Sequence, residues 1–201
     1  MTTTQKTTPC PLKLVDYHHP LLRQIIEPVQ FPLSKKDKQL INDMKHAIQK
    51  EHLKEDAVGM AANQWGINKR IFLFCPEDTA DGLEIIINPS YKPLSDTTMG
   101  SPLQDLTWEC CFSIPLATGH VKRYTHIQVI YQNPEGKTIV RELKGLPARI
   151  WQHENDHLNG LLYDDLKAGK CTDKREFTTD SELDNFFKNL RKSFEEPLQD
   201  V

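Results

Sequence analysis

The chain has 201 residues, a length that suits one domain built around one hydrophobic core. Its 38% hydrophobic and 26% charged residues are slightly polar for a globular protein and exclude a disordered chain. The formal net charge of −3 gives no basic footprint for nucleic acid, and no apolar run approaches the roughly 20 residues that span a bilayer. We therefore expect neither direct DNA binding nor membrane insertion.

The N-terminal segment 1–11 is rich in threonine and lacks the apolar stretch of a secretory signal, so we expect a flexible extension there. No internal repeat or change of composition divides the rest, which predicts a single domain over residues 12–201, including a C-terminal helix. The five cysteines are odd in number and irregular in spacing, which argues against a disulfide framework and favours a reduced, cytoplasmic setting.

The first predicted helix begins after Ser34, because Ser34 and Asp37 form the pattern of a helix-capping box. Apolar residues then recur at spacings of three and four as far as about Leu53, which predicts an amphipathic helix. Its expected buried face consists of Leu40, Ile41, Met44, Ala47 and Ile48.

The segment Ala57–Gln64 is small and apolar and contains Gly59. Small side chains let another backbone come close, so one interpretation is a tight loop packed against the core. The other interpretation is one wall of a site, to which Gln64 would offer an amide donor. The residues of this segment alone leave both interpretations open.

Short segments rich in β-branched and aromatic residues predict the strands. We expect the strand that starts at Trp108 to stop at Pro115, and residues 88–107 to form a long surface loop. A turn at 133–136 makes the last two strands a hairpin. Helical spacing over Ser181–Phe194 predicts a C-terminal helix that docks on the body of the protein. The predicted strands cover residues 70–74, 84–87, 108–114, 121–124, 126–132 and 138–143.

Residues 145–160 carry the pattern His153-Glu154-x-x-His157 within a sequence of helical periodicity. On a helix the two histidines lie roughly 40° apart and about 6 Å along the axis, so both imidazoles can reach one metal ion. Glu154 can then reach a water bound to that ion. The simpler interpretation is an amphipathic helix with two exposed histidines. A catalytic metal site also needs a third protein ligand, which this pattern leaves open.

Three stretches in this order, Ala57–Gln64, Glu109–Ser113 and Gln152–His157, together resemble the peptide deformylase family. The family carries a Gly-x-Gly-Leu-Ala-Ala-x-Gln loop, a Glu-Gly-Cys-Leu-Ser strand and a Gln-His-Glu-x-Asp-His helix. The match in order and spacing extends over most of Leu12–Lys167. The resemblance implies an α+β fold in which short antiparallel or mixed sheets surround a central metal-binding helix, with an N-terminal and a C-terminal helix outside.

The resemblance also implies a metal-dependent enzyme. This hydrolase removes the formyl group from the N-terminal formyl-methionine of newly made polypeptides and releases formate. The third metal ligand would be Cys111, beside His153 and His157. The ion would be one divalent metal, Fe²⁺ in the living cell, for which Zn²⁺, Ni²⁺ or Co²⁺ can substitute. Its partners would be N-formyl-methionyl nascent peptides in the bacterial cytoplasm, with a weak association with the ribosome.

The same resemblance assigns the catalytic and substrate-binding residues. Glu154 would act as general base and acid for a metal-activated water. Gln64 and the backbone N–H of Phe112 would stabilise the oxyanion that forms on the formyl group. The substrate would lie beside Gly59, its methionine side chain in an apolar pocket. The expected substrate-binding residues are Val58, Gly59, Cys110, Leu146 and Ile150.

The sequence departs from the family pattern at Ala57, Met60, Asn63, Cys110 and Phe112, where the family has Gly, Leu, Pro, Gly and Leu. Ala57 and Cys110 leave open a deformylase-like protein that has lost this substrate. A general peptidase with the His-Glu-x-x-His pattern would instead use a histidine or a glutamate as its third ligand. A non-enzymatic module that binds the ribosome through its tail is a further alternative, which the weakly basic tail does not favour.

Charged residues also lie on the segments that carry the expected ligands. We hypothesise that Arg123 and Asp156 form an ion pair behind the ligands, together with Glu109. The alternative is a solvated surface arginine, which would contribute little.

Overall fold

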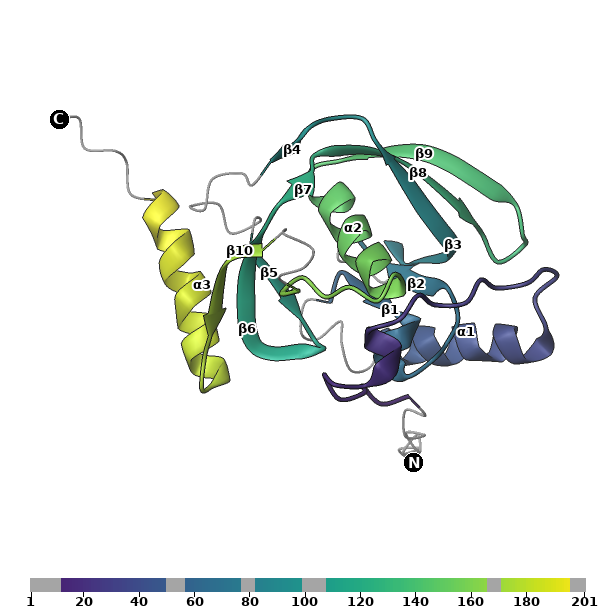
Figure 1. Ribbon diagram of the computed structural model, residues 1–201, viewed down its shortest axis with the longest axis horizontal. Coiled ribbons are helices and arrows are strands. Elements are labelled where there is room, and N and C mark those ends of the chain that lie inside the picture. Colours follow the sequence, from purple (N-terminus) through teal and green to yellow (C-terminus); the bar gives the residue numbers. More distant parts are fainter. Residues whose placement is uncertain (1–11, 50–56, 77–81, 99–107, 166–170, 196–201) are drawn as a thin grey trace, which may run out of the picture.

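The computed structural model describes residues 12–49, 57–76, 82–98, 108–165 and 171–195 (Figure 1). The expected flexible extension 1–11 lies outside these residues. Within them the helices are α1 (Lys35–Ala47), α2 (Leu146–Leu158) and α3 (Asp180–Glu195), with 3₁₀ turns η1 (Pro20–Leu22) and η4 (Ala62–Trp65). The strands are β1 (Gly59–Ala61), β2 (Ile71–Phe74), β3 (Glu84–Pro93), β4 (Thr97–Thr98), β5 (Trp108–Cys111), β6 (Ile114–Val121), β7 (Arg123–Tyr124), β8 (His126–Gln132), β9 (Thr138–Lys144) and β10 (Cys171–Glu176).

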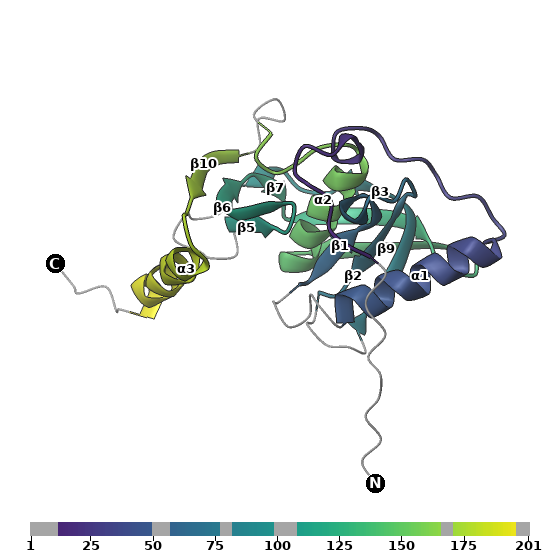
Figure 2. The same ribbon diagram turned by 90° about the horizontal axis from the view of Figure 1, so that it is seen from below.

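Antiparallel sheets surround the central helix α2, as Figure 1 shows. One sheet has the strand order β1-β2-β3-β8-β9, a second has the order β10-β6-β5, and a short ribbon pairs β4 with β7. The helices α1 and α3 lie on opposite sides of the molecule (Figure 2). The predicted α+β fold, with a central helix and two outer helices, is therefore confirmed.

Helix α2 is held against the larger sheet by its aromatic residue Trp151, which is fully buried. The indole lies edge-on to the rings of Phe72, Phe74 and Tyr131, with ring centroids 4.9, 5.7 and 5.4 Å away. Such edge-to-face pairs add to the free energy gained by burying the apolar area itself. The packing fixes which face of α2 looks away from the sheet, and that face carries His153 and His157.

The N-terminus of α1 confirms the predicted capping box. The hydroxyl of Ser34 accepts a hydrogen bond from the backbone N–H of Asp37, and the Asp37 carboxylate accepts one from the backbone N–H of Ser34. Regular helix ends at Ala47 with Ile48 as its cap, and positions 50–53 of the predicted helix lie outside the described residues. Ile41, Met44, Ala47 and Ile48 are buried as expected, whereas Leu40 is half-buried.

The prediction of a surface loop over residues 88–107 was wrong in its first part, because β3 continues to Pro93 and β4 follows it. The strand absorbs a bulge at Asn88, which has a φ of 52°. The Asn88 side chain compensates for this bend, since it accepts a hydrogen bond from the Val29 N–H and donates to the Val29 carbonyl and to Gln132. Residues 99–107 lie outside the described part of the chain.

The strand predicted from Trp108 to Pro115 was also wrong, because β5 ends earlier, at Cys111, and a separate strand, β6, runs through Pro115 from Ile114 to Val121. Pro115 is paired with no residue of β5 or β10, the two strands next to β6. Its missing N–H therefore removes no hydrogen bond between the strands. The edge strand β10 was not predicted at all. Its sequence, Cys171–Glu176, is mostly charged and exposed, so it lacks the apolar alternation that predicts a strand.

The predicted C-terminal helix is confirmed as α3, which packs on the sheet β10-β6-β5. The Phe186 ring lies edge-on to Trp108 of β5, with centroids 5.0 Å apart. No helix in the described part of the chain is long and apolar enough to cross a membrane.

Candidate metal centre and active-site cleft

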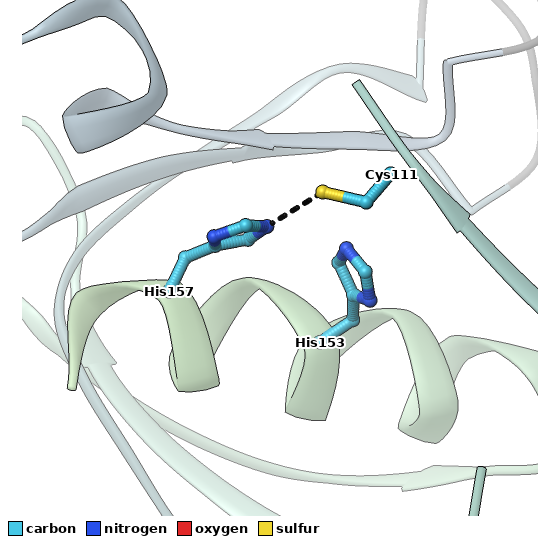
Figure 3. Close-up of side chains that lie close together, drawn as sticks. All are labelled: Cys111, His153 and His157. Atoms are coloured by element: carbon cyan, nitrogen blue, oxygen red, sulfur yellow. Dashed lines mark hydrogen bonds between the residues drawn. The ribbon is translucent and has the colours of Figure 1, made fainter. Parts of the chain in front are cut away.

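Three side chains from two distant segments meet on the face of α2 that looks away from the larger sheet, where Cys111 and His157 are buried and His153 is half-buried. Cys111 is the last residue of β5, and His153 and His157 lie one turn apart on the helix. Figure 3 shows both rings turned toward the sulfur, and the Cys111 Sγ lies 3.2 Å from the His157 Nε2. One ligand atom from each residue lies within 4.8 Å of the other two, an arrangement that could hold one metal ion.

The geometry and chemistry of these donors fit a divalent transition metal. In a tetrahedral zinc site, Zn–S of about 2.3 Å and Zn–N of about 2.0 Å put sulfur and nitrogen about 3.5 Å apart. The observed 3.2 Å between Cys111 and His157 is close to this separation. One thiolate with two imidazoles suits Fe²⁺, Zn²⁺, Ni²⁺ or Co²⁺ better than Mg²⁺ or Ca²⁺, which prefer oxygen.

A carboxylate behind the site fixes the orientation of His153. Its Nδ1 lies 2.9 Å from the Glu109 Oε2, which leaves Nε2 to face the sulfur. Glu109 in turn accepts hydrogen bonds from Arg123, at 2.7 and 2.9 Å, and from Arg149, at 2.8 Å. Arg123 also pairs with Asp156 on α2. The hypothesised ion pair is therefore present, and because Arg123 is 2% exposed, the alternative of a solvated surface arginine is wrong.

The charges of this cluster decide the protonation of its members. Burial alone would raise the pKa of Glu109, but the charges and hydrogen bonds of Arg123 and His153 together outweigh burial and hold this pKa well below its usual range. Glu109 is therefore an anion. Burial and the nearby charge of His153 hold the pKa of His157 well below its usual range, so His157 is a neutral imidazole, the form in which histidine can bind a metal.

Glu154 points its carboxylate toward β1. A Cβ added at Gly59 would lie 2.6 Å from the Glu154 Oε1, so only glycine leaves room for the carboxylate there. The other oxygen, Oε2, is buried and has no hydrogen-bond partner among the described residues. Burial raises the pKa of Glu154 to about 7, which makes this carboxylate able to take and return a proton near neutral pH.

Gln64 presents its amide nitrogen to the sulfur of the candidate ligand Cys111. Its Oε1 accepts a hydrogen bond from the backbone N–H of Ala61, at 2.9 Å, which fixes which end of the amide points inward. Its Nε2 donates to the Ser113 hydroxyl, at 3.2 Å, and lies 3.6 Å from the Cys111 Sγ. Ser113 is 3% exposed, and no pattern in the sequence marks it as part of the site.

A cleft of about 1290 Å³ opens beside the three candidate ligands. Every predicted site residue except the buried His157 lines it. These are the candidate ligands Cys111 and His153, the expected catalytic residues Gln64, Phe112 and Glu154, and the expected substrate-binding residues Val58, Gly59, Cys110, Leu146 and Ile150. Of the two interpretations of Ala57–Gln64, the wall of a site is therefore the one that this geometry favours.

The sequence model of one family, described as polypeptide deformylase, matches residues 11–172 of the chain. The chain belongs to the polypeptide deformylase family. Deformylases are enzymes, metal-dependent amide hydrolases, and their shared activity is the deformylation of N-formyl-methionine peptides.

Individual deformylases agree with this assignment. The peptide deformylase of Symbiobacterium thermophilum is 33% identical over 171 residues, which cover 85% of this chain and 71% of the relative. The actinonin complex of a Synechococcus elongatus deformylase has a TM-score of 0.67 at 29% identity and covers 81% of this chain and 86% of that one. The Met-Ala-Ser-bound deformylase of Acinetobacter baumannii has a TM-score of 0.63 at 29% identity, covering 76% and 95%.

Two departures from the deformylase pattern have visible structural consequences. Asn63 stands where the family has proline, and its amide donates to the carbonyls of His157, at 2.6 Å, and Leu21, at 3.0 Å. Asn63 therefore connects the end of α2 to the 3₁₀ turn η1. Cys110 stands where the family has glycine. Its side chain is exposed in the cleft, whereas that of Cys111 is buried, as strand alternation predicts.

Several residues of this deformylase site were not found from the sequence. Arg149 bridges Glu109 and the carbonyl of Val121, and the Tyr163 ring stacks on His153 at an interplanar angle of 28°. Neither residue lies in a motif. Residues of α3 also line the cleft, and the amphipathic spacing of the tail was their only signal in the sequence.

Proposed function

We propose that this deformylase removes the formyl group from formyl-methionine at the N-terminus of newly made polypeptides, with Glu154 as the proton-transfer residue. One observation carries the proposal. A buried carboxylate with a pKa of about 7 lies in the same cleft as the Cys111, His153 and His157 cluster.

Cys111, His153 and His157 would hold the metal. The bound ion supplies a Lewis acid that polarises a carbonyl oxygen and acidifies water. We propose Fe²⁺ as the ion in the living cell. The cysteines in the described part of the chain are free thiols, which suits the reducing bacterial cytoplasm that we propose as the compartment.

Glu154 would take the proton of the attacking water with its unpaired Oε2 and return it to the amine nitrogen that leaves the formyl carbon. Near neutral pH, a carboxylic acid with a pKa of about 7 is present in both protonation states, so it can perform both transfers. Gly59 preserves this arrangement, because a side chain at its position would meet the Glu154 carboxylate.

Gln64 and the backbone N–H of Phe112 would donate hydrogen bonds to the oxygen that becomes negative during the attack. The hydrogen bond from Ala61 supports this proposal, because it holds the Gln64 Nε2 on the side of the candidate ligands. One such prearranged donor lowers the barrier by about 3 kcal/mol in a comparable acyl-transfer site.

The methionine side chain would enter the apolar part of the cleft lined by Val58, Leu146 and Ile150. An unbranched apolar side chain fits a pocket of this composition. Gly59 and Cys110, from β1 and β5, would lie beside the extended peptide backbone.

The experiment is formate release from formyl-Met-Ala-Ser by anaerobically purified protein loaded with Fe²⁺ or Ni²⁺, together with metal analysis. We expect Glu154→Gln to lower the rate about 10²- to 10⁴-fold, because proton transfer is lost, while the metal content stays at one ion per chain. The matched control is Glu142→Gln on β9. The Glu142 side chain is 54% exposed, so this variant should keep the wild-type rate.

A Glu154→Gln variant that works at full rate would contradict the assignment of the base. Metal-loaded protein that is inert on every formyl-methionyl peptide would instead indicate a relative that has lost this substrate. Cleavage of internal peptide bonds, with full metal content in Cys111→Ala, would indicate the general peptidase.

A further inference from the structure

The active-site cleft continues past the metal centre to the C-terminal helix α3. The helix residues that line it recur at spacings of three and four, so they form one continuous face. They are Asp180, Leu183, Asp184, Phe187, Lys188 and Lys192. In both views α3 lies beside β5 and β6, away from β1 (Figures 1 and 2). The cleft therefore has two walls, β1 on one side and α3 on the other.

A different side of α3 attaches the helix to the protein. The Phe186 ring packs against Trp108 and Phe177, with centroids 5.0 and 5.6 Å away. The guanidinium of Arg175 on β10 lies over the rings of Trp108 and Phe186, 5.6 and 5.5 Å from their centroids. The cleft-facing residues Leu183 and Phe187 are half-buried. The Phe187 ring lies edge-on to Phe186, with centroids 5.3 Å apart, whereas Trp108 and Phe177 contact Phe186 itself.

The cleft is larger than formyl-methionine requires. Binding pockets for small ligands usually enclose about 300 to 1,000 Å³, and this cleft encloses about 1290 Å³. The face of α3 from Asp180 to Lys192 is about 18 Å long, at about 1.5 Å per helical residue. An extended peptide rises about 3.3 Å per residue, so the wall can face about five residues of substrate.

The charges on this face favour a peptide over a nucleic acid. Two carboxylates, Asp180 and Asp184, balance two ammonium groups, Lys188 and Lys192, so the face has no net charge to attract a polyanion. Between these charges lie the apolar side chains of Leu183 and Phe187. Such a surface suits an apolar side chain of a peptide, flanked by polar groups that stay hydrated.

We propose that α3 is a specificity-determining wall of the substrate cleft. In this proposal Leu183 and Phe187 contact an apolar side chain that follows the formyl-methionine of the nascent peptide. The inference rests on the proposed function, because it concerns the same substrate. The match to the deformylase family ends at residue 172, before α3 begins, so this wall belongs to a part of the chain that the family pattern does not describe.

The test compares kcat/KM for a long peptide, formyl-Met-Ala-Leu-Leu-Leu, with kcat/KM for formyl-Met-Ala. We expect the double variant Leu183→Ala with Phe187→Ala to lower the ratio of these two values about tenfold, mainly through KM for the long peptide. The conservative variant Phe187→Leu should keep most of the ratio. The matched control is Asn185→Ala with Asn189→Ala, two exposed positions of the same helix that do not line the cleft.

An unchanged ratio in the Leu183 and Phe187 double variant, or an equal fall in the asparagine control, would overturn the proposal. Calorimetric titration with unformylated Met-Ala-Leu-Leu-Leu repeats the comparison without turnover. We expect about tenfold weaker binding by the Leu183 and Phe187 double variant and wild-type binding by the control. Wild-type protein that releases formate from neither peptide would refute the proposed function, and the titration would still decide whether α3 contacts the peptide.

Discussion

Helices α2 and α3 face the same cleft, but the chain holds them by different means. Helix α2 buries nine of its 13 residues, and among these Glu154 and Asp156 are charged groups that need specific surroundings. None of the described side chains of α3 is fully buried, and the helix attaches mainly through Phe186. The residues proposed to carry out the reaction therefore lie where their neighbours are buried and paired, whereas the surface proposed to select the substrate lies where side chains can change without unfolding the protein.

The largest expected effect is a difference in the free energy of unfolding between variants of two arginines, Arg123, which pairs with Asp156 on α2, and Arg175, which lies over Phe186 of α3. Arg123→Met removes the arginine that neutralises the buried carboxylates of Glu109 and Asp156 and leaves Glu109 with Arg149 and His153, so the free energy of unfolding should fall by about 3–5 kcal/mol. Arg175→Met, beside α3, removes a side chain that is 51% exposed and should cost less than about 1 kcal/mol. Urea unfolding of both variants measures the difference, and equal losses would contradict the comparison.

A smaller effect, on the rate of formate release and not on stability, is expected for a change at Gly59. Gly59→Ala places a Cβ 2.6 Å from the Glu154 Oε1, so the carboxylate must move away from its position beside β1. Misplacement of a reacting group by about 1 Å costs about 10²-fold in rate, so formate release should fall by about this factor. Metal content and urea stability should stay near wild type, because the candidate ligands do not move. A variant that loses its metal instead would show that the change disturbs α2 as a whole.

The smallest expected effect is the difference in free energy of unfolding between variants that remove the N-terminal cap of α1 and of α3. Ser34→Ala removes the cap of α1, whose buried face is part of the core, and should lower the free energy of unfolding by about 1 kcal/mol. Thr179→Ala removes the hydroxyl that accepts a hydrogen bond from the Glu182 N–H at the start of α3. It should speed hydrogen exchange in α3 and leave global unfolding within about 0.5 kcal/mol of wild type. Global destabilisation of both variants to the same degree would contradict the weak coupling of α3.

The α1 cap also has a pH dependence. The hydrogen bond from Ser34 lowers the pKa of Asp37 below its ordinary 3.8. The charged carboxylate therefore contributes stability above pH 3.8, and this contribution is lost as the pH falls through the lowered pKa. The stability difference between wild type and Ser34→Ala should accordingly narrow in acid. A difference that widens below pH 4 would reverse the assigned sign.

Features of the molecule that depend on neighbours along the chain were predictable from the sequence by itself. The capping box of α1, the hairpin β8–β9, the helical spacing of His153 and His157 and the helix α3 all come from short-range periodicity, which the order of residues states directly. Cys111 was reached only through the resemblance to a family, because no local pattern connects a strand residue to a helix 46 positions away.

Only the tertiary structure decided the features that depend on distant partners. The bulge at Asn88 keeps β3 in the sheet because Val29 and Gln132 satisfy its side chain, and Arg123 is buried because carboxylates from β5 and α2 converge on it. The pKa of Glu154 follows from burial, and the place of α3 beside the cleft follows from the contacts of Phe186 with Trp108, Phe177 and Arg175. The burial of a side chain and the meeting of charged partners arise only when the chain folds, because both need residues that lie far apart in the sequence.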